Sequence, residues 1–309
     1  MSIIATGHKN PDTDSVISSI AIAHLMHKRG FTDCRPVMQG RMNPETRFVL
    51  EMFKLEEPDV MISVKDQDVI IVDTTDTAQL PSDITLANNI IAMVDHHQLG
   101  DLTTTSPVEM WVWPVGCTAT IIAKMYAFYG FEIPTDIAGG MMSAIISDTV
   151  LFKSPTTTPA DKMAVENLAK IAGIDNIEEF GMKILMKKSD VENETPIDLL
   201  KRDFKDFTMA GKRFGIGQVE VIALSMLDKK RDGLIDEMRK LKEEKNYGTV
   251  MLMLTDIMKE GTELLCISDE ISIIERAFDK QFENGISMWL DGVMSRKKQI
   301  IPPLENVLK

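Results

Sequence analysis

The sequence predicts an α/β protein with two domains: a doubly wound parallel sheet domain at the N-terminus and a smaller α/β domain after it. Over residues 1–188, short apolar runs alternate with segments of helical periodicity, which is the pattern of successive βα units. The polar, acidic stretch 189–195 interrupts that pattern as a linker would, and residues 196–309 form the second domain. A chain of 309 residues is long enough for both.

Local signals set the expected ends of the elements in the first domain. Gly30 and Gly130 each follow a helical segment as a C-terminal cap, and Asn43-Pro44-Glu45 supplies an N-cap, a first-position proline and a first-turn acid. We expect strands at 2–6, 34–38, 68–72 and 90–94, and helices at 14–29, 44–53, 118–129, 134–147, 159–172 and 175–187.

The second domain is predicted from a few shorter features. We expect a hairpin around Ala210-Gly211-Lys212, a charged helix at 228–245, and strands at 249–254 and 264–267. These elements predict a compact α/β unit. We expect the active site in the cleft between this unit and the first domain.

Composition argues against several classes of protein. The balance of 34 basic against 47 acidic residues gives a net charge of −13, which disfavours a nucleic-acid-binding surface. The chain starts without a signal-peptide pattern, and no apolar run approaches the roughly 20 residues that span a bilayer. Three scattered cysteines predict neither a disulfide framework nor a structural zinc site. We expect a cytoplasmic protein that binds neither nucleic acid nor membranes.

Acid and imidazole groups recur where the predicted strands and one apolar helix end. They lie in the segments 7–14 (GHKNPDTD), 72–73, 94–97 (VDHH) and 146–148 (ISD). Because the carboxyl ends of parallel strands open onto one crevice, side chains far apart in sequence converge there. The candidate ligands are His8, Asp12, Asp14, Asp73, His96 and Asp148.

These carboxylates would repel one another unless cations neutralised them. Mixed imidazole and carboxylate ligands suit Mn²⁺, Co²⁺ or Zn²⁺ better than Ca²⁺. Six ligands suit two ions about 3.5–4 Å apart that activate a shared water. Each signal alone has a plainer interpretation, such as a helix N-cap for Asp73, and the turn Gly116-Cys117-Thr118 is either a phosphate cradle or a packing turn. The joint occurrence of the ligands favours metal binding.

A compact run of cations lies near the end of the chain, at Ser295-Arg296-Lys297-Lys298-Gln299. Such runs are often only solvated surface. Opposite an acidic, metal-binding domain, the run would instead clamp a polyanion, with Arg296 binding a phosphate in bidentate fashion and the lysines acting as point charges. Lys205 is a weaker candidate for the same role.

With these residues in view, the chain resembles the family II inorganic pyrophosphatases of the DHH phosphoesterase superfamily over nearly its whole length. The matching motifs are GHxNPDTD at 7–14, DHH at 95–97, SD at 147–148 and SRKKQ at 295–299. The first two are shared across the superfamily, whereas SRKKQ belongs to the C-terminal domain type of the pyrophosphatases. Thr74 departs from the pattern, because many members have histidine there. The chain has no room for a regulatory nucleotide-binding insertion.

The resemblance implies a role for each candidate. One metal would be held by His8, Asp12 and Asp73, and the second by Asp14, Asp73, His96 and Asp148, with Asp73 bridging. Substrate phosphates would be bound by His97, Lys205, Arg296, Lys297 and Lys298, the first four also being catalytic. Asp95 would orient a histidine. The resemblance further implies two Mn²⁺ or Co²⁺ per subunit, Mg²⁺ arriving with pyrophosphate, and a homodimer formed through the N-terminal domain.

The resulting hypothesis is hydrolysis of pyrophosphate to two phosphates. A hydroxide bridging the metals would attack phosphorus in line, Arg296 and Lys297 would stabilise the transferring oxygens, and His97 would protonate the leaving phosphate. Closure of the second domain about residues 189–196 would complete the site. Two alternatives stay open. One is a DHH enzyme acting on oligoribonucleotides, cyclic dinucleotides or polyphosphate, and the other is a non-catalytic metal or phosphate sensor.

Overall fold

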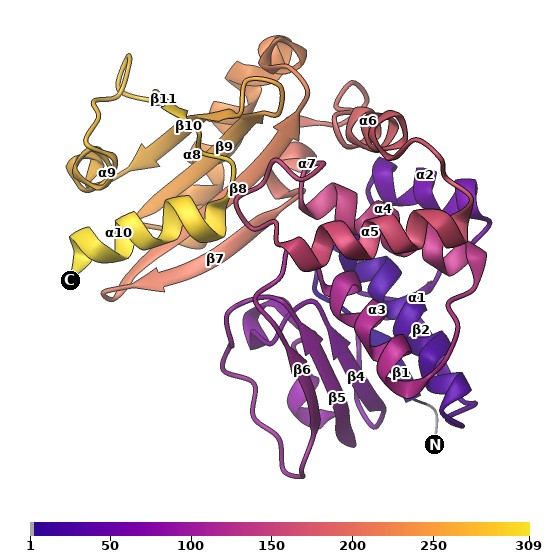
Figure 1. Cartoon of the computed structure of the whole chain (residues 1–309). Helices are drawn as coiled ribbons and strands as arrows, with labels where there is room; N and C mark the ends of the chain where they lie inside the picture. Colours follow the sequence, from indigo (N-terminus) through magenta and orange to yellow (C-terminus); the bar gives the residue numbers. More distant parts are fainter. Residues whose placement is uncertain (1–2) are drawn as a thin grey trace. The chain divides into compact units, whose positions relative to one another are not determined.

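The computed structural model describes residues 3–309, so Ser2, expected in the first strand, lies outside the described residues. The chain divides into two compact units, Met1–Lys187 and Lys188–Lys309 (Figure 1). Within residues 3–309, no helix combines the length and the apolar character that crossing a bilayer requires.

In residues 3–187, the first unit forms a six-stranded parallel sheet with the order β3-β2-β1-β4-β5-β6. Its strands are β1 (Ile3–Thr6), β2 (Cys34–Met38), β3 (Asp59–Val60), β4 (Asp68–Val72), β5 (Asn89–Asp95) and β6 (Glu109–Val112). The strand order reverses beside β1, which pairs in parallel with both β2 and β4. The loops after β1 and β4 therefore start from neighbouring strand ends, the position where open α/β sheets bind ligands.

Both faces of this sheet are buried, as the apolar sequence of β4 (DVIIV) requires. Ile70 and Val72 pack against the helices, which gather on one side of the sheet in Figure 1, while Val69 and Ile71 face loop segments on the other side. The helices are α1 (Thr13–Lys28), α2 (Pro44–Phe53), α3 (Thr118–Tyr129), α4 (Thr135–Asp148), α5 (Pro159–Ala172) and α6 (Ile177–Lys188). The 3₁₀ turns η1 (Thr77–Gln79) and η2 (Ile84–Leu86) lie in the loops on the second face.

The predicted fold class is confirmed, and most helix ends agree within one or two residues. Helix α1 starts at Thr13 rather than at Asp14, because the Asp12 carboxylate caps it by accepting from the Ser15 N–H group. The Asn43 cap of α2 and the Gly130 cap of α3 are confirmed. Strands β3 and β6 were not expected, since each is short and lacks a buried apolar run.

In residues 188–309, the second unit forms a five-stranded sheet with the order β11-β10-β9-β8-β7, in which only β8 and β9 pair in parallel. The strands are β7 (Phe204–Met209), β8 (Lys212–Val221), β9 (Thr249–Asp256), β10 (Gly261–Ser268) and β11 (Ser287–Asp291). The expected hairpin joins β7 to β8 through Ala210 and Gly211, with φ of 48° and 75°. Two consecutive left-handed residues are typical of the turn that matches strand twist.

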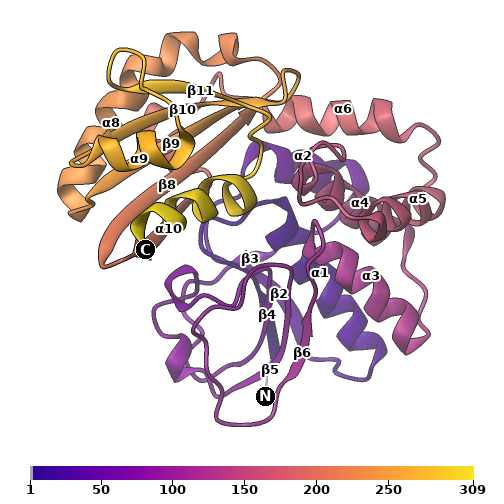
Figure 2. The ribbon, with the colours of Figure 1, turned by 60° about the vertical axis from the view of Figure 1, so that its left-hand side comes forward.

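Helices cover both faces of the second sheet. Figure 2 shows α8 (Arg231–Lys245) on one face and α9 (Ile271–Phe278) with α10 (Ile301–Leu308) on the other. Helix α8 packs on one apolar cluster, and α9 and α10 share a second. The short α7 (Pro196–Lys201) joins the cluster of α8. The helix expected from residue 228 begins at Arg231, because residues Leu224–Lys230 form the 3₁₀ turn η3.

The acidic stretch expected as a linker is held by residues of the second unit. The Ser189 hydroxyl is buried and accepts from the Ile222 N–H group at 2.9 Å. Arg202 donates to the carbonyl oxygens of Lys188 and Asp190 at 2.6 and 2.7 Å, and it pairs with Glu194. These contacts make the stretch part of the second unit's packing.

Candidate metal centre

The loops and termini at the carboxyl end of the first sheet bring the predicted ligands together. His8 and Asp12 lie in the loop after β1, and Asp14 lies in the first turn of α1. Asp73 directly follows β4, and His96 directly follows β5. Asp148 is the last residue of α4, as expected from the apolar sequence of that helix.

Asp73 lies at the centre of the cluster. Its Oδ2 atom is 3.3 Å from His8 Nε2, and its Oδ1 atom is 3.5 Å from His96 Nε2 and 3.7 Å from His97 Nδ1. The side chain is only 2% exposed. Its φ of 63° is unusual for a residue with a Cβ, and such strained backbone is concentrated at functional sites. One carboxylate thus contacts three imidazole rings from two loops.

The two buried histidines are oriented in the same way. His8 Nδ1 lies 2.7 Å from the Lys9 carbonyl oxygen, and His96 Nδ1 lies 3.0 Å from the Val115 carbonyl oxygen. Carbonyl oxygens only accept, so each Nδ1 carries a proton and each Nε2 is left to face the carboxylates. Among the described residues, the buried Nε2 atom of His8 has no hydrogen-bond partner. This is the arrangement of a histidine prepared to bind a metal through Nε2.

Further carboxylates complete the cluster. Asp12 Oδ2 is 3.4 Å from His8 Nε2, and Asp148 Oδ2 is 3.9 Å from His96 Nε2. Asp14 is fully buried and accepts from the Ser18 hydroxyl at 2.8 Å and from the N–H groups of Thr118 and Ala119 at 2.6 and 3.1 Å.

The buried carboxylates of the cluster favour bound positive charge, as the pKa values of its members indicate. Burial opposes the charged form of His8, but Asp12 and Asp73 outweigh it and raise the pKa of His8 to about 10. Burial, followed by the charge of Asp73, raises the pKa of Asp14 to about 7. Burial also opposes ionisation of Asp73, yet the imidazoles of His8 and His96 that face its two oxygens hold its pKa well below its usual range. A bound cation would offset the same buried carboxylate charge that raises the pKa values of His8 and Asp14.

Ligand atoms gather in three sets: Asp73, His96 and His97; His8, Asp12 and Asp73; and Asp14, Cys117 and Asp148, each within 4.8 Å. Imidazole and carboxylate donors of this kind fit Mn²⁺ or Co²⁺. Cys117 is a poor ligand here, because burial holds the pKa of its thiol well above the usual value.

His97 is held by Asp95, as expected for an orienting carboxylate. The buried Asp95 Oδ1 atom accepts from the His97 backbone N–H group at 3.0 Å and from its Nδ1 at 2.9 Å. These two bonds fix both the backbone and the ring of His97. The His97 side chain is 28% exposed, against 7% for His96, so His97 is the more accessible to solvent of the two.

Sequence reasoning singled out Thr118 in the turn before α3 without foreseeing its contact with Asp73, and it missed Asp161. The Thr118 hydroxyl donates to Asp73 Oδ1 at 3.2 Å, and the N–H groups of Thr118 and Ala119 are used by Asp14. The turn before α3 therefore packs on the ligands, and these N–H groups are not free to hold a phosphate. In the sequence, Asp161 is recognisable only as part of the capping box that begins at Thr158. A capping box predicts where a helix starts, but it does not predict contacts with residues far away in the chain.

The SRKKQ segment of the second unit is an ordered π-helical turn, Arg296–Ile300. Gln299 Oε1 accepts from the N–H groups of Met294 and Ser295 at 2.9 and 3.0 Å, and the Ser295 hydroxyl accepts from the Lys298 N–H group. The serine and glutamine of the motif thus hold the backbone on which the three cations lie.

Arg296 makes internal contacts in this structure. Its Nη1 donates to the carbonyl oxygens of Asp203 and Ile216 at 2.7 and 3.1 Å, and its Nη2 donates to Asp203 Oδ1 at 2.7 Å. The side chain is 9% exposed. Lys205 lies two residues after Asp203, on β7. These bonds engage both terminal nitrogens of the guanidinium within the second unit.

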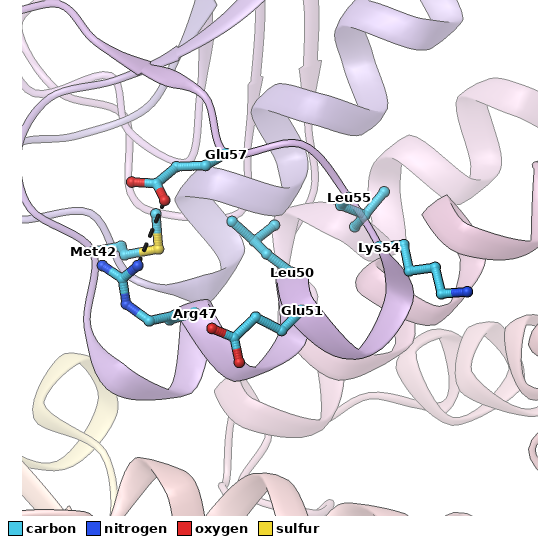
Figure 3. A pocket seen from close by; sticks show the side chains of 7 residues that line it. All are labelled: Met42, Arg47, Leu50, Glu51, Lys54, Leu55 and Glu57. Carbon is cyan, nitrogen blue, oxygen red and sulfur yellow. Dashed lines mark ion pairs between the residues drawn. The ribbon is translucent and has the colours of Figure 1, made fainter.

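A surface hollow of about 250 Å³ lies beside α2, separate from the ligand cluster (Figure 3). Its charged groups include Arg47 and Glu57, which pair with each other at 3.5 Å and are both about half exposed. The hollow shares no residue with the cluster, so it does not bear on the chemistry of the centre.

Known proteins resemble this chain over nearly its whole length. Residues 2–145 match the DHH family N-terminal domain, and residues 182–307 match the DHHA2 domain. The chain is 49% identical to a probable manganese-dependent inorganic pyrophosphatase of Archaeoglobus fulgidus, over 98% of this chain and 97% of the relative. It is 46% identical to the manganese-dependent inorganic pyrophosphatase of Methanocaldococcus jannaschii, over 97% of each chain. A crystal structure of a putative family II inorganic pyrophosphatase from Methanococcus jannaschii superimposes with a TM-score of 0.90 at 45% identity, covering 99% of both chains.

Proposed function

The chain belongs to the family II, manganese-dependent inorganic pyrophosphatases, and from this membership we propose that it hydrolyses pyrophosphate to two phosphates at the Asp73 centre. Its activity is that of an inorganic pyrophosphatase, a hydrolase. The observation that carries the proposal is the convergence of His8 Nε2 and His96 Nε2 on the two oxygens of one buried carboxylate, Asp73. An arrangement of this kind serves a pair of metal ions that share a ligand.

We assign the metals as follows. One Mn²⁺ or Co²⁺ would be held by His8, Asp12 and Asp73, and a second by Asp14, Asp73, His96 and Asp148. The orphaned Nε2 atom of His8 and the surplus of buried carboxylate charge support this assignment. When bound, such ions lower the pKa of water and offset the charge of phosphoryl oxygens.

The remaining roles fall to side chains that bind phosphate. Lys205, Arg296, Lys297 and Lys298 would bind substrate oxygens, with Arg296 and Lys297 stabilising the charge that develops during transfer. His97, oriented by Asp95, would deliver a proton to the leaving phosphate. Mg²⁺ would enter with the substrate. We also propose that the enzyme works in the cytoplasm, where its three buried, unpaired cysteines would stay reduced.

The proposal is tested by phosphate release from Mg-pyrophosphate. Metal-stripped protein is first incubated with Mn²⁺, Co²⁺, Zn²⁺ or buffer alone, and a di-adenylate oligonucleotide and tripolyphosphate serve as parallel substrates. We expect fast release from pyrophosphate that depends on Mn²⁺ or Co²⁺. Hydrolysis of the dinucleotide without hydrolysis of pyrophosphate would instead assign another substrate to this centre, and no hydrolysis of any substrate would favour a sensor.

Metal binding is expected to release protons and to strengthen with pH. Near neutral pH, His8 is an imidazolium, since its pKa is about 10, and Asp14 is partly protonated, since its pKa is about 7. Both groups must lose a proton to bind a metal, so apparent Mn²⁺ affinity should rise at least about tenfold per pH unit between roughly pH 6 and pH 8. Calorimetry in buffers of different ionisation heat measures the released protons. An affinity that stays flat over this range would contradict the assignment of His8.

We propose a homodimer formed through the edge strand β6 of the first unit. β6 is the last strand of its sheet, and the exposed Met110 and Trp113 lie on or just after it. Phe128 is 69% exposed and packs edge-on against Trp111 at a ring distance of 5.2 Å. An open strand edge beside exposed aromatic rings is a surface that a second copy can cover.

Substituting Met110→Asp is expected to shift the protein from dimer to monomer, because it places a charge in that surface. Light scattering after size-exclusion chromatography measures the mass. Met258→Asp is the matched control, since Met258 is 57% exposed in the second unit, against 48% for Met110. A wild-type monomer at micromolar concentration, or a dimer that survives Met110→Asp, would rule out this interface.

A further inference from the structure

We propose that Asp161, a residue outside the assigned ligand set, positions the metal centre by anchoring the turn that precedes and begins α3. The inference rests on the proposed function, because it concerns the geometry of the same ligands. Asp161 lies in the first turn of α5 and is fully buried. Its carboxylate contacts Gly116 and Thr120 of the stretch 115–120, which makes hydrogen bonds to three assigned ligands.

The stretch 115–120 makes a hydrogen bond to ligands from three different elements. The Val115 carbonyl oxygen accepts from His96 Nδ1, and the N–H groups of Thr118 and Ala119 donate to Asp14. The Thr118 hydroxyl donates to Asp73. A shift of this one stretch would therefore displace His96, Asp14 and Asp73 together.

Asp161 holds that stretch at two points. Its Oδ2 atom accepts from the Gly116 N–H group at 2.9 Å, and its Oδ1 atom accepts from the Thr120 hydroxyl at 2.7 Å. The turn lies directly against the carboxylate, because a Cβ on Gly116 would come within 2.9 Å of Asp161 Oδ2. The two anchors bracket residues 117–119, which include the N–H donors to Asp14.

The capping of α5 explains neither the bond of Asp161 to Gly116 nor its bond to Thr120. The cap needs only the bonds that Asp161 Oδ2 accepts from the Thr158 N–H group and hydroxyl, each at 2.7 Å. The contacts to Gly116 and Thr120 join α5 to a segment 45 and 41 residues away. A buried carboxylate is costly unless its oxygens are fully bonded, and here the N-terminal ends of α3 and α5 both supply donors. Metal ligands tolerate displacements of only about 0.2 Å, so such an anchor bears on affinity.

The experiment compares Asp161→Asn and Thr120→Val with Glu109→Gln in the full-length protein. Asp161→Asn replaces one acceptor oxygen by a donor, and Thr120→Val removes only the hydroxyl that Oδ1 accepts from. Glu109 is the control because its carboxylate also accepts three side-chain bonds, from Arg29, Trp111 and Tyr129, but at the first residue of β6, the opposite strand end from the centre. The dissociation constant of Mn²⁺ is measured by electron paramagnetic resonance of the free ion, beside thermal unfolding of each metal-free variant.

We expect Asp161→Asn to weaken Mn²⁺ binding on the order of 10- to 100-fold, the range found for residues that support metal ligands. Thr120→Val should weaken it less, and Thr120→Ser should restore it because the hydroxyl returns. Glu109→Gln should lower the unfolding temperature while leaving Mn²⁺ affinity unchanged. If Asp161→Asn does not fold, Thr120→Val and Thr120→Ser carry the test.

Wild-type Mn²⁺ affinity in both Asp161→Asn and Thr120→Val would overturn the positioning role. Equal weakening by Glu109→Gln would overturn it as well, since the effect would then follow general destabilisation. Failure of the proposed function has a different signature, in which the wild-type protein binds Mn²⁺ tightly and the Asp161 and Thr120 variants bind it weakly, yet none hydrolyses pyrophosphate.

Discussion

Replacing Asp73 with alanine is expected to abolish tight Mn²⁺ binding and pyrophosphate hydrolysis together. Asp73 contacts His8, His96 and His97 through its two oxygens, so its loss removes the shared element of both assigned metal sites. The remaining carboxylates cannot replace it, because each contacts only part of the cluster. We expect activity to fall by at least about 10³-fold, since both the Lewis acid and the activated water depend on the metals.

This result is measured as Mn²⁺ affinity at equilibrium and as phosphate release under the same metal concentrations. Asp101→Ala is the matched control: Asp101 accepts from the Thr77 N–H group and hydroxyl in an exposed loop of the same unit. That variant should retain both properties. Full activity of Asp73→Ala would contradict the two-metal assignment, and lost activity with unchanged Mn²⁺ affinity would place the metals elsewhere.

Lys297→Ala is expected to reduce kcat/KM for pyrophosphate on the order of 10²- to 10³-fold while leaving Mn²⁺ affinity unchanged. A fixed cation that meets charge developing on phosphoryl oxygens contributes most in the transition state. Lys297 is a cleaner probe than Arg296. Removing Arg296 would also leave Asp203 and the Ile216 carbonyl oxygen without the hydrogen bonds that Arg296 donates, which would destabilise the second unit.

The measurement is steady-state kinetics over a range of salt concentrations, paired with Mn²⁺ titration. Lys259→Ala, at an exposed lysine of the same unit, serves as the control and should leave kcat/KM unchanged. A Lys297→Ala variant with wild-type kcat/KM would show that the SRKKQ cations are solvated surface. Loss of Mn²⁺ affinity in this variant would instead show that the separation of metal and phosphate binding is wrong.

Several parts of the fold follow from local sequence because their signals are short-range. The Asn43-Pro44 start of α2, the Gly130 end of α3 and the left-handed turn at Ala210-Gly211 are each set by residues that sit next to one another. Strands β3 and β6 were not predicted, because each is only a few residues long. Each is a strand because it pairs with a neighbouring strand from another part of the chain. Their register is a property of the assembled sheet.

The candidate ligands were predictable for a related reason. His8, Asp73, His96 and Asp148 lie next to strand or helix ends that the apolar pattern predicts, and parallel topology then brings those ends together. The orientation of each ring was not predictable. It depends on the carbonyl oxygens of Lys9 and Val115, whose positions follow from loop geometry.

By itself, the sequence determined the fold class, the family and the segments that carry the candidate ligands, because these depend on motifs and on periodicity along the chain. Only the tertiary structure decided three hydrogen bonds: from the Gly116 N–H group to Asp161, from Thr118 to Asp73, and from Arg296 to Asp203. These contacts join residues 45, 45 and 93 positions apart. A hydrogen bond forms only when packing brings donor and acceptor within about 3 Å, and no local pattern of residue types encodes that distance.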